Sequence, residues 1–95
     1  MTAFEWDERK AEVNRQKHGI GFNDAAAAWL GMRLTKPSLH PEEARFVSLC
    51  MTNGRLIAVV WTQRGDAVRL ISARIARSDE RKQYDQAIRR SVEDR

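Results

Sequence analysis

The residues of this sequence that could carry out chemistry are cations, one histidine and one tyrosine. Histidine exchanges protons near neutral pH, and His18 lies in a patterned segment, while Tyr84 adds a hydroxyl donor. Arginine forks match phosphate oxygens, and four arginines lie on or beside predicted strands: Arg45, Arg69, Arg74 and Arg77. RNA cleavage by the RNA's own 2′-hydroxyl requires a base, cations on the phosphate and an acid for the leaving 5′-oxygen. The set is sufficient for that reaction without a metal.

Each of these residues also has a structural interpretation, and their spacing leaves both interpretations open. His18 is suited to the negative end of a helix dipole. The arginines are equally suited to solvated strand faces. Tyr84 is suited to a core position with a polar tip in water.

Metal and nucleotide chemistry have little support in the sequence. His18, His40 and Cys50 lack the close paired spacing of zinc sites. Gly19 and Gly21 lack the Walker lysine and the third glycine of a Rossmann loop. We therefore expect no metal and no cofactor, and we interpret Cys50 as an inert core residue.

The composition predicts one small basic domain over residues 1–95. Hydrophobic residues make up 42% of the chain, which is enough for a single core. A single cysteine cannot form an internal disulfide, the N-terminus lacks the pattern of a signal peptide, and the longest apolar run is too short to cross a bilayer. We therefore expect a cytoplasmic protein without membrane contact. With 17 Lys and Arg against 13 Asp and Glu, the net charge of +4 favours nucleic acid or an acidic protein as partner.

The first part of the chain predicts a short strand and two helices. Residues 4–6 alternate aromatic and charged side chains, and Asp7 is a suitable N-cap for a helix over residues 8–18 that ends at Gly19. Its apolar face is thin, mainly Ala11 and Val13. A second helix begins at residues 22–24 with Asn23 as the expected cap, and ends at Gly31.

The remainder predicts an antiparallel meander and a final helix. After a brief strand at residues 33–35 and an irregular loop to residue 43, β-rich runs at 45–52 and 55–63 flank Asn53-Gly54, a dipeptide typical of type I′ hairpins. A third strand covers residues 67–75, and because it is apolar at both parities, both sheet faces are expected to be partly covered. The last helix follows Ser78, its expected cap, and docks on the sheet or a partner through one apolar stripe: Tyr84, Ala87, Ile88 and Val92.

Five motifs cover nearly the whole chain from Phe4 to Tyr84. They are Phe4-x-Trp6-Asp7-x-x-Lys10, Asn14-x-x-Lys17-His18-Gly19-x-x-Phe22, Arg45-Phe46, Arg69-x-Ile71-Ser72-Ala73-Arg74-x-Ala76 and Glu80-x-x-x-Tyr84. In this order they resemble the BrnT family of toxins from type II toxin–antitoxin systems. Residues 33–43 match no part of that pattern.

The resemblance implies a RelE-like α+β fold, with a three-stranded antiparallel meander, one or two further short strands, two N-terminal helices and one C-terminal helix. It implies a metal-independent endoribonuclease that inhibits translation and is neutralised by a BrnA-like antitoxin. Operator DNA is then bound only indirectly, through the ribbon-helix-helix part of the antitoxin, and a toxin dimer within the complex is a further expectation. We assign catalysis to His18, Arg45, Arg74 and Tyr84, and RNA binding to Lys17, Arg69 and Arg77.

A second interpretation, from a different class, is a non-catalytic basic module that binds an acidic protein or nucleic acid. Direct DNA binding is weaker, because no helix-turn-helix or zinc-finger signature is visible. RNA cleavage by the purified chain in excess chelator distinguishes the ribonuclease from the binding module.

Overall fold

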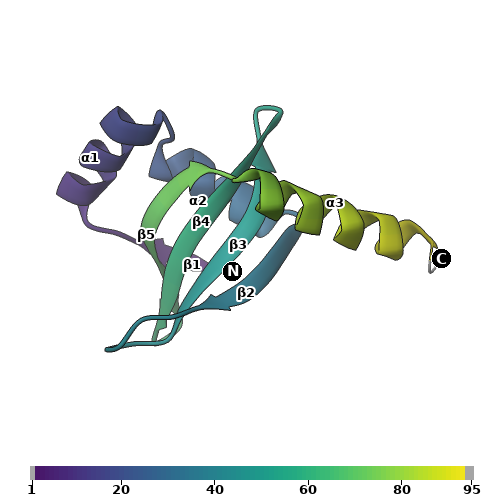
Figure 1. Ribbon diagram of the computed structural model, residues 1–95. Helices are drawn as coiled ribbons and strands as arrows, with labels where there is room; N and C mark the ends of the chain where they lie inside the picture. Colours follow the sequence, from purple (N-terminus) through teal and green to yellow (C-terminus); the bar gives the residue numbers. More distant parts are fainter. Residues whose placement is uncertain (1, 94–95) are drawn as a thin grey trace.

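The computed structural model describes residues 2–93 and shows a five-stranded mixed sheet with three helices (Figure 1). Along the chain the elements are β1 (Ala3–Glu5), α1 (Glu8–His18), α2 (Phe22–Leu30), β2 (Arg33–Ser38), β3 (Arg45–Thr52), β4 (Arg55–Arg64), β5 (Ala67–Ile75) and α3 (Ser78–Glu93). The strands lie in the order β1-β5-β4-β3-β2. The predicted α+β class is confirmed.

Strands β3, β4 and β5 form the predicted antiparallel meander. Asn53 and Gly54 have φ angles of 50° and 77°, and a type I′ turn requires positive φ at both of these positions. The ladder between β4 and β5 contains an irregularity after Val60, so that Ile71 has no direct partner on β4. This extra residue shifts the side-chain alternation of β5 by one position.

The two edge strands differ from the prediction. β1 pairs with β5 in parallel, so the sheet is mixed rather than wholly antiparallel. No hairpin joins these two strands, and the local sequence therefore does not set their relative direction. β2 continues to Ser38, so the irregular loop predicted after residue 35 is wrong for residues 36–38. Pro37 is tolerated there because an edge strand has one side without ladder partners.

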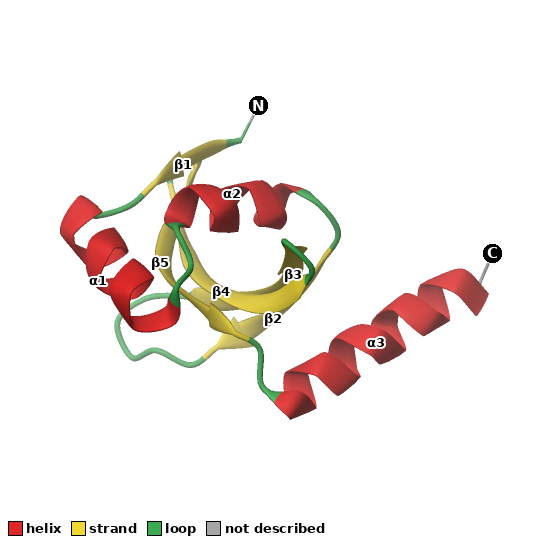
Figure 2. Cartoon of the chain, turned by 90° about the horizontal axis from the view of Figure 1, so that it is seen from above, coloured by secondary structure: helices red, strands yellow, loops and turns green. Residues whose placement is uncertain are grey.

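Apolar side chains cover both faces of the sheet, as predicted. On one face, α2 packs over Ile57 and Val59 of β4. On the other face, Tyr84 of α3 packs against Leu56 and Ala58 of the same strand. Figure 2 shows α2 and α3 on opposite sides of the sheet. β4 is apolar at both parities because each of its faces meets a helix.

The helix ends depend on different caps from one helix to the next. Asp7 accepts hydrogen bonds from the backbone N–H groups of Arg9 and Lys10, and Gly19 ends α1 with a φ of 72°, as predicted. The N-cap of α2 is Gly21, two residues before the expected cap, and it makes no side-chain hydrogen bond. The capping role predicted for Asn23 is therefore wrong, because this residue already lies inside the first turn.

Asn14 joins α1 to the part of β5 that β1 does not pair with. Its side-chain amide donates to the carbonyl of Ala73 at 2.9 Å and accepts from the N–H of Ala73 at 3.1 Å, as a neighbouring strand would. The same amide donates to the carbonyl of Ile20 at 3.3 Å. Asn14 is buried, whereas Val13 is 63% exposed, so the apolar face predicted for α1 is wrong at Val13. A polar clamp, rather than an apolar stripe, anchors this end of α1.

The start of α3 is stabilised by a carboxylate instead of the predicted serine cap. Ser78 already belongs to the helix, and Glu80 accepts a hydrogen bond from the backbone N–H of Arg77 at 2.8 Å. Tyr84 and Ile88 pack on the sheet, but Val92 is 64% exposed. The predicted docking stripe is therefore wrong at its last member, because the helix extends beyond the sheet edge (Figure 1).

Candidate functional site

One cross-strand row carries two of the predicted site arginines on the same face of the sheet. Arg45 of β3 pairs with Thr62 of β4, and Thr62 pairs with Arg69 of β5. Because adjacent strands lie about 4.8 Å apart, the Cα atoms of the two arginines are roughly 10 Å apart. Thr62 between them is short, and its hydroxyl donates inward to the carbonyl of Ala44 at 2.7 Å. The short side chain of Thr62 therefore leaves space between the two longer arginine side chains.

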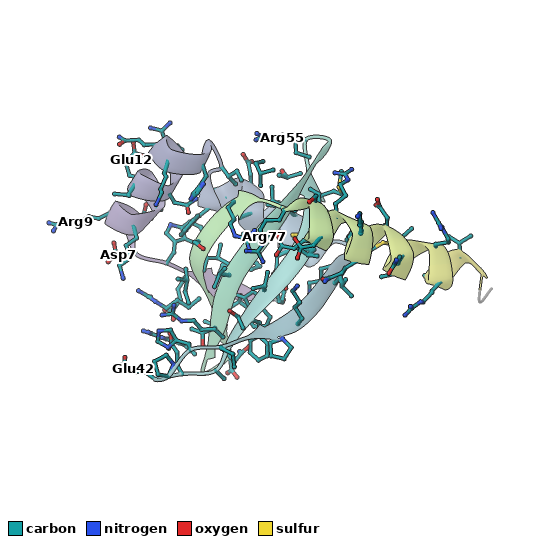
Figure 3. All side chains as sticks on the ribbon, in the orientation of Figure 1. Asp7, Arg9, Glu12, Glu42, Arg55 and Arg77 are labelled. Carbon is teal, nitrogen blue, oxygen red and sulfur yellow. The ribbon has the colours of Figure 1, made fainter. Side chains whose placement is uncertain are left out.

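A pocket of about 90 Å³ opens beside this row. We name it the arginine pocket, and it is lined by Asp7, Lys10, Glu43, Arg45, Arg64, Arg69, Leu70 and Ile71. In Figure 3, Glu42, the chain neighbour of Glu43, marks this end of the sheet, and Arg55 marks the opposite end. The pocket thus brings four cations together: Lys10, Arg45, Arg64 and Arg69. They come from α1, β3, β4 and β5.

Carboxylates partly neutralise the arginine pocket. Glu43 accepts a hydrogen bond from Nε of Arg45 at 2.8 Å, and its second oxygen lies 4.0 Å from Arg64. Glu5 lies 3.9 Å from Arg69. The hydrogen bond from Arg45 holds the pKa of Glu43 below its ordinary value, despite partial desolvation. Glu43 is therefore ionised at neutral pH.

A second, larger hollow of about 350 Å³ runs between α1 and β5. We name it the basic groove, and it is lined by Arg9, Lys10, Val13, Asn14, Lys17, His18, Ile71 and Ser72. It shares Lys10 and Ile71 with the arginine pocket, so the two form one continuous surface. At 1.5 Å per residue, Lys10 and His18 lie about 12 Å apart along the helix axis. Lys17 and His18 are therefore at one end of this surface, and Arg45 and Arg69 are at the other.

Arg74 lies in an ion pair with a buried carboxylate instead of in either hollow. Its guanidinium makes two hydrogen bonds to Glu80, at 2.7 and 3.1 Å, and the side chain of Glu80 is only 1% exposed. Arg74 is five residues beyond Arg69 on the same strand, which corresponds to roughly 16 Å. Its geometry is that of a contact between β5 and the start of α3.

Tyr84 and Arg77 also lie away from the two hollows. Tyr84 is buried on the α3 face of the sheet, and this burial raises the pKa of its hydroxyl. The side chain of Arg77 is 65% exposed and lies 3.6 Å from the carboxylate of Asp79. The two hollows thus contain four of the seven predicted site residues, and the other three, Arg74, Arg77 and Tyr84, lie beside or on α3.

Three residues of the arginine pocket were missed by the analysis of the sequence. Lys10 is part of a motif but was assigned no role, and Arg64 lies just beyond the strand predicted for residues 55–63 and was assigned none either. Glu43 lies in the segment that matched no pattern. The one available signal was its position two residues before Arg45, which is the spacing of neighbours on the same side of an extended chain.

The sequence also raised the questions of a metal site, a reactive cysteine and a membrane span. Within residues 2–93, no group of three or more His, Cys, Asp or Glu side chains is arranged to hold a metal. Cys50 is fully buried, and burial raises the pKa of its thiol to about 11, so the thiol is protonated at neutral pH. None of the described helices has the length and apolar character to span a membrane.

The α+β fold and the continuous line of cations define a small basic domain suited to a polymer that carries phosphates. The family described as the ribonuclease toxin BrnT of type II toxin–antitoxin systems matches residues 6–80. The chain belongs to this family of ribonuclease toxins, and membership implies an antitoxin partner. No curated protein matches the chain. The matched span includes each predicted site residue except Tyr84.

The Arg74–Glu80 pair gives a prediction about stability and pH. The hydrogen bonds from Arg74 are the main cause that lowers the pKa of Glu80 from 4.5 to about 2. A carboxylate whose pKa is lowered in the folded state stabilises the fold at pH values above its ordinary pKa. This stabilisation is lost as the pH falls from about 4.5 towards 2. Glu80→Gln should lower the free energy of unfolding at pH 7 by about 3 kcal/mol, because it removes the buried carboxylate charge that Arg74 and the backbone N–H of Arg77 stabilise.

Urea unfolding at pH 7 and at pH 3 measures both effects. The variant should lose less stability than the parent between these two pH values. Asp79→Asn, at an exposed neighbour that also carries one negative charge, is the matched control. Equal stability of the two variants at pH 7 would contradict a structural role of the Arg74–Glu80 pair.

Proposed function

We propose that this toxin is a metal-independent endoribonuclease that cleaves cytoplasmic RNA through the RNA's own 2′-hydroxyl and so inhibits translation. The observation that carries the proposal is the row of Arg45, Thr62 and Arg69, in which the Cα atoms of the two arginines are roughly 10 Å apart on one face of the sheet. Such donors stabilise the charge that develops on a phosphate during the attack. Lys10 extends the positive surface towards Lys17 and His18.

In this proposal, one RNA strand follows the whole surface and its phosphates are bound at two places. One phosphate binds at the arginine pocket and another near Lys17 and His18, because these ends are too far apart to contact the same phosphate. Arg74, Arg77 and Tyr84 then support α3 and the sheet edge. Their predicted direct roles in catalysis and RNA binding remain predictions.

Cleavage in excess chelator tests the function. The purified toxin should cut RNA in EDTA and leave 2′,3′-cyclic phosphate and 5′-hydroxyl ends. Arg69→Gln should weaken binding to uncleavable 2′-O-methyl RNA by roughly 10-fold and reduce the salt slope of binding by about 1. Arg55→Gln removes the same charge at the other end of the sheet and should change neither value. Binding without any cleavage would favour the non-catalytic module instead.

The role of His18 is tested separately. An acid or base for the scissile phosphate contributes about 100- to 10,000-fold in rate. With cleavage at the arginine pocket, His18→Gln should lose no more than about 10-fold, mainly in RNA binding, and should melt like the parent. A loss of 100-fold or more in a folded variant would instead confirm the acid–base role that the sequence assigns to His18, and would move the cleaved phosphate to that end of the groove.

We also propose that a BrnA-like antitoxin neutralises the toxin by covering Arg45 and Arg69. Both side chains are about three-quarters buried by their own neighbours, so a partner has only a small charged opening to close. Titration with the cognate antitoxin should abolish binding of 2′-O-methyl RNA and RNA cleavage together. An inhibited complex that still binds this RNA with full affinity would contradict the mechanism. A toxin dimer within the complex remains a prediction.

A further inference from the structure

We propose that Glu43 is the general base of the ribonuclease reaction and takes the proton of the 2′-hydroxyl when the adjoining phosphate binds in the arginine pocket. The inference rests on the proposed function of this surface and adds a catalytic residue that none of the sequence motifs contains.

The two oxygens of Glu43 have different environments. Oε1 accepts the hydrogen bond from Nε of Arg45 at 2.8 Å. Oε2 is 4.0 Å from Arg64, which is outside hydrogen-bond range, and it has no other hydrogen bond within the described part of the chain. The side chain is 28% exposed and lines the pocket. Arg45 therefore orients the carboxylate while one oxygen remains available for a proton.

The other carboxylates near the arginines are engaged differently. Glu80 is 1% exposed, and both of its oxygens accept hydrogen bonds from Arg74. Asp7 lines the same pocket as Glu43, but its Oδ1 accepts from two backbone N–H groups at the start of α1 and it makes no hydrogen bond to an arginine of the row. Glu5 lies 3.9 Å from Arg69, which is outside hydrogen-bond range, so no arginine orients it. Within residues 2–93, Glu43 thus combines an open position, a free oxygen and an orienting hydrogen bond from an arginine of the row.

The cations of the pocket complete the arrangement. Arg45 donates to Glu43 through Nε, and its terminal nitrogens make no hydrogen bond within the described residues, so they are available to a phosphate. Arg69 lies on the other side of Thr62 from Arg45, and Lys10 and Arg64 line the same pocket. A phosphate held between the two guanidinium groups would bring the 2′-hydroxyl of its own nucleotide next to Glu43. A glutamate carboxylate is ionised at neutral pH, and the hydrogen bond from Arg45 keeps the pKa of Glu43 low, so the carboxylate is in the proton-accepting form.

The step balances without a metal or cofactor. The 2′-hydroxyl proton passes to Oε2 as the 2′-oxygen forms a bond to phosphorus. The bond between phosphorus and the 5′-oxygen breaks, and the leaving oxygen takes a proton from water at the open mouth of the pocket. Protonated Glu43 then returns its proton to the hydroxide left by that water. The products are a 2′,3′-cyclic phosphate and a 5′-hydroxyl.

A matched pair of variants tests the inference. Glu43→Gln keeps the shape of the side chain but cannot accept the proton, so cleavage in EDTA should fall by at least about 100-fold. Its affinity for 2′-O-methyl RNA should stay equal or increase, because one negative charge leaves the phosphate site. Glu42→Gln removes the same charge from an exposed neighbour and should retain parental cleavage, binding and melting.

Each outcome gives a decision. If Glu43→Gln cleaves at the parental rate, Glu43 only occupies the arginines and the inference is wrong. If Glu43→Gln unfolds, Glu43→Asp decides: a folded Asp variant must keep more cleavage than an Ala variant of equal RNA affinity, and equal rates would overturn the role. If the parent itself does not cleave RNA in EDTA, the proposed function fails first, independently of these variants.

Discussion

The register of the β3–β4–β5 meander is the constraint on which the candidate site depends. Arg45, Thr62 and Arg69 share one row because backbone hydrogen bonds align three strands. A slip of one residue in either ladder would turn one arginine to the opposite face, which α2 covers. The two-residue turn at Asn53-Gly54 sets the first of these ladders. The spacing of the Cα atoms of the two arginines proposed to bind phosphate is therefore set by the backbone.

The attachment of α1 to the sheet creates the second part of the basic surface. α1 has little apolar surface, and the buried amide of Asn14 takes the position of a strand partner for Ala73. β1 occupies the same edge of β5 only as far as Arg69. Asn14 therefore satisfies backbone groups that β1 does not reach, and it holds Lys10, Lys17 and His18 along the wall of the groove.

Two carboxylate–arginine pairs on this sheet illustrate how environment separates structural from chemical roles. In Arg74–Glu80 the carboxylate is 1% exposed and both of its oxygens accept hydrogen bonds, so it stabilises the junction between β5 and α3 and is closed to a substrate. In Arg45–Glu43 the carboxylate is 28% exposed and one of its oxygens has no hydrogen bond, which is the basis of the role proposed for it. The two arginines are almost equally exposed, so the burial of the carboxylate makes the difference.

The sequence by itself determined the local structure and the charge. The Asn53-Gly54 turn, the caps Asp7 and Gly19, and the apolar parity of the strands are local signals, because they depend on φ preferences and on near neighbours. Family motifs likewise identified His18, Arg45 and Arg69 as residues of interest. No local signal could separate Arg45 from Arg74, since both are strand arginines beside apolar residues.

Tertiary structure decided which cations meet and which charges are buried. The parallel pairing of β1, the length of β2 and the clamp of Asn14 all involve partners distant in sequence, so they follow from packing rather than propensity. The same long-range pairing brought Glu43 and Lys10 to the arginine row and moved Arg74 and Tyr84 under α3. The physical reason is that a site's charge and solvent access depend on neighbours in space, which register and burial set together.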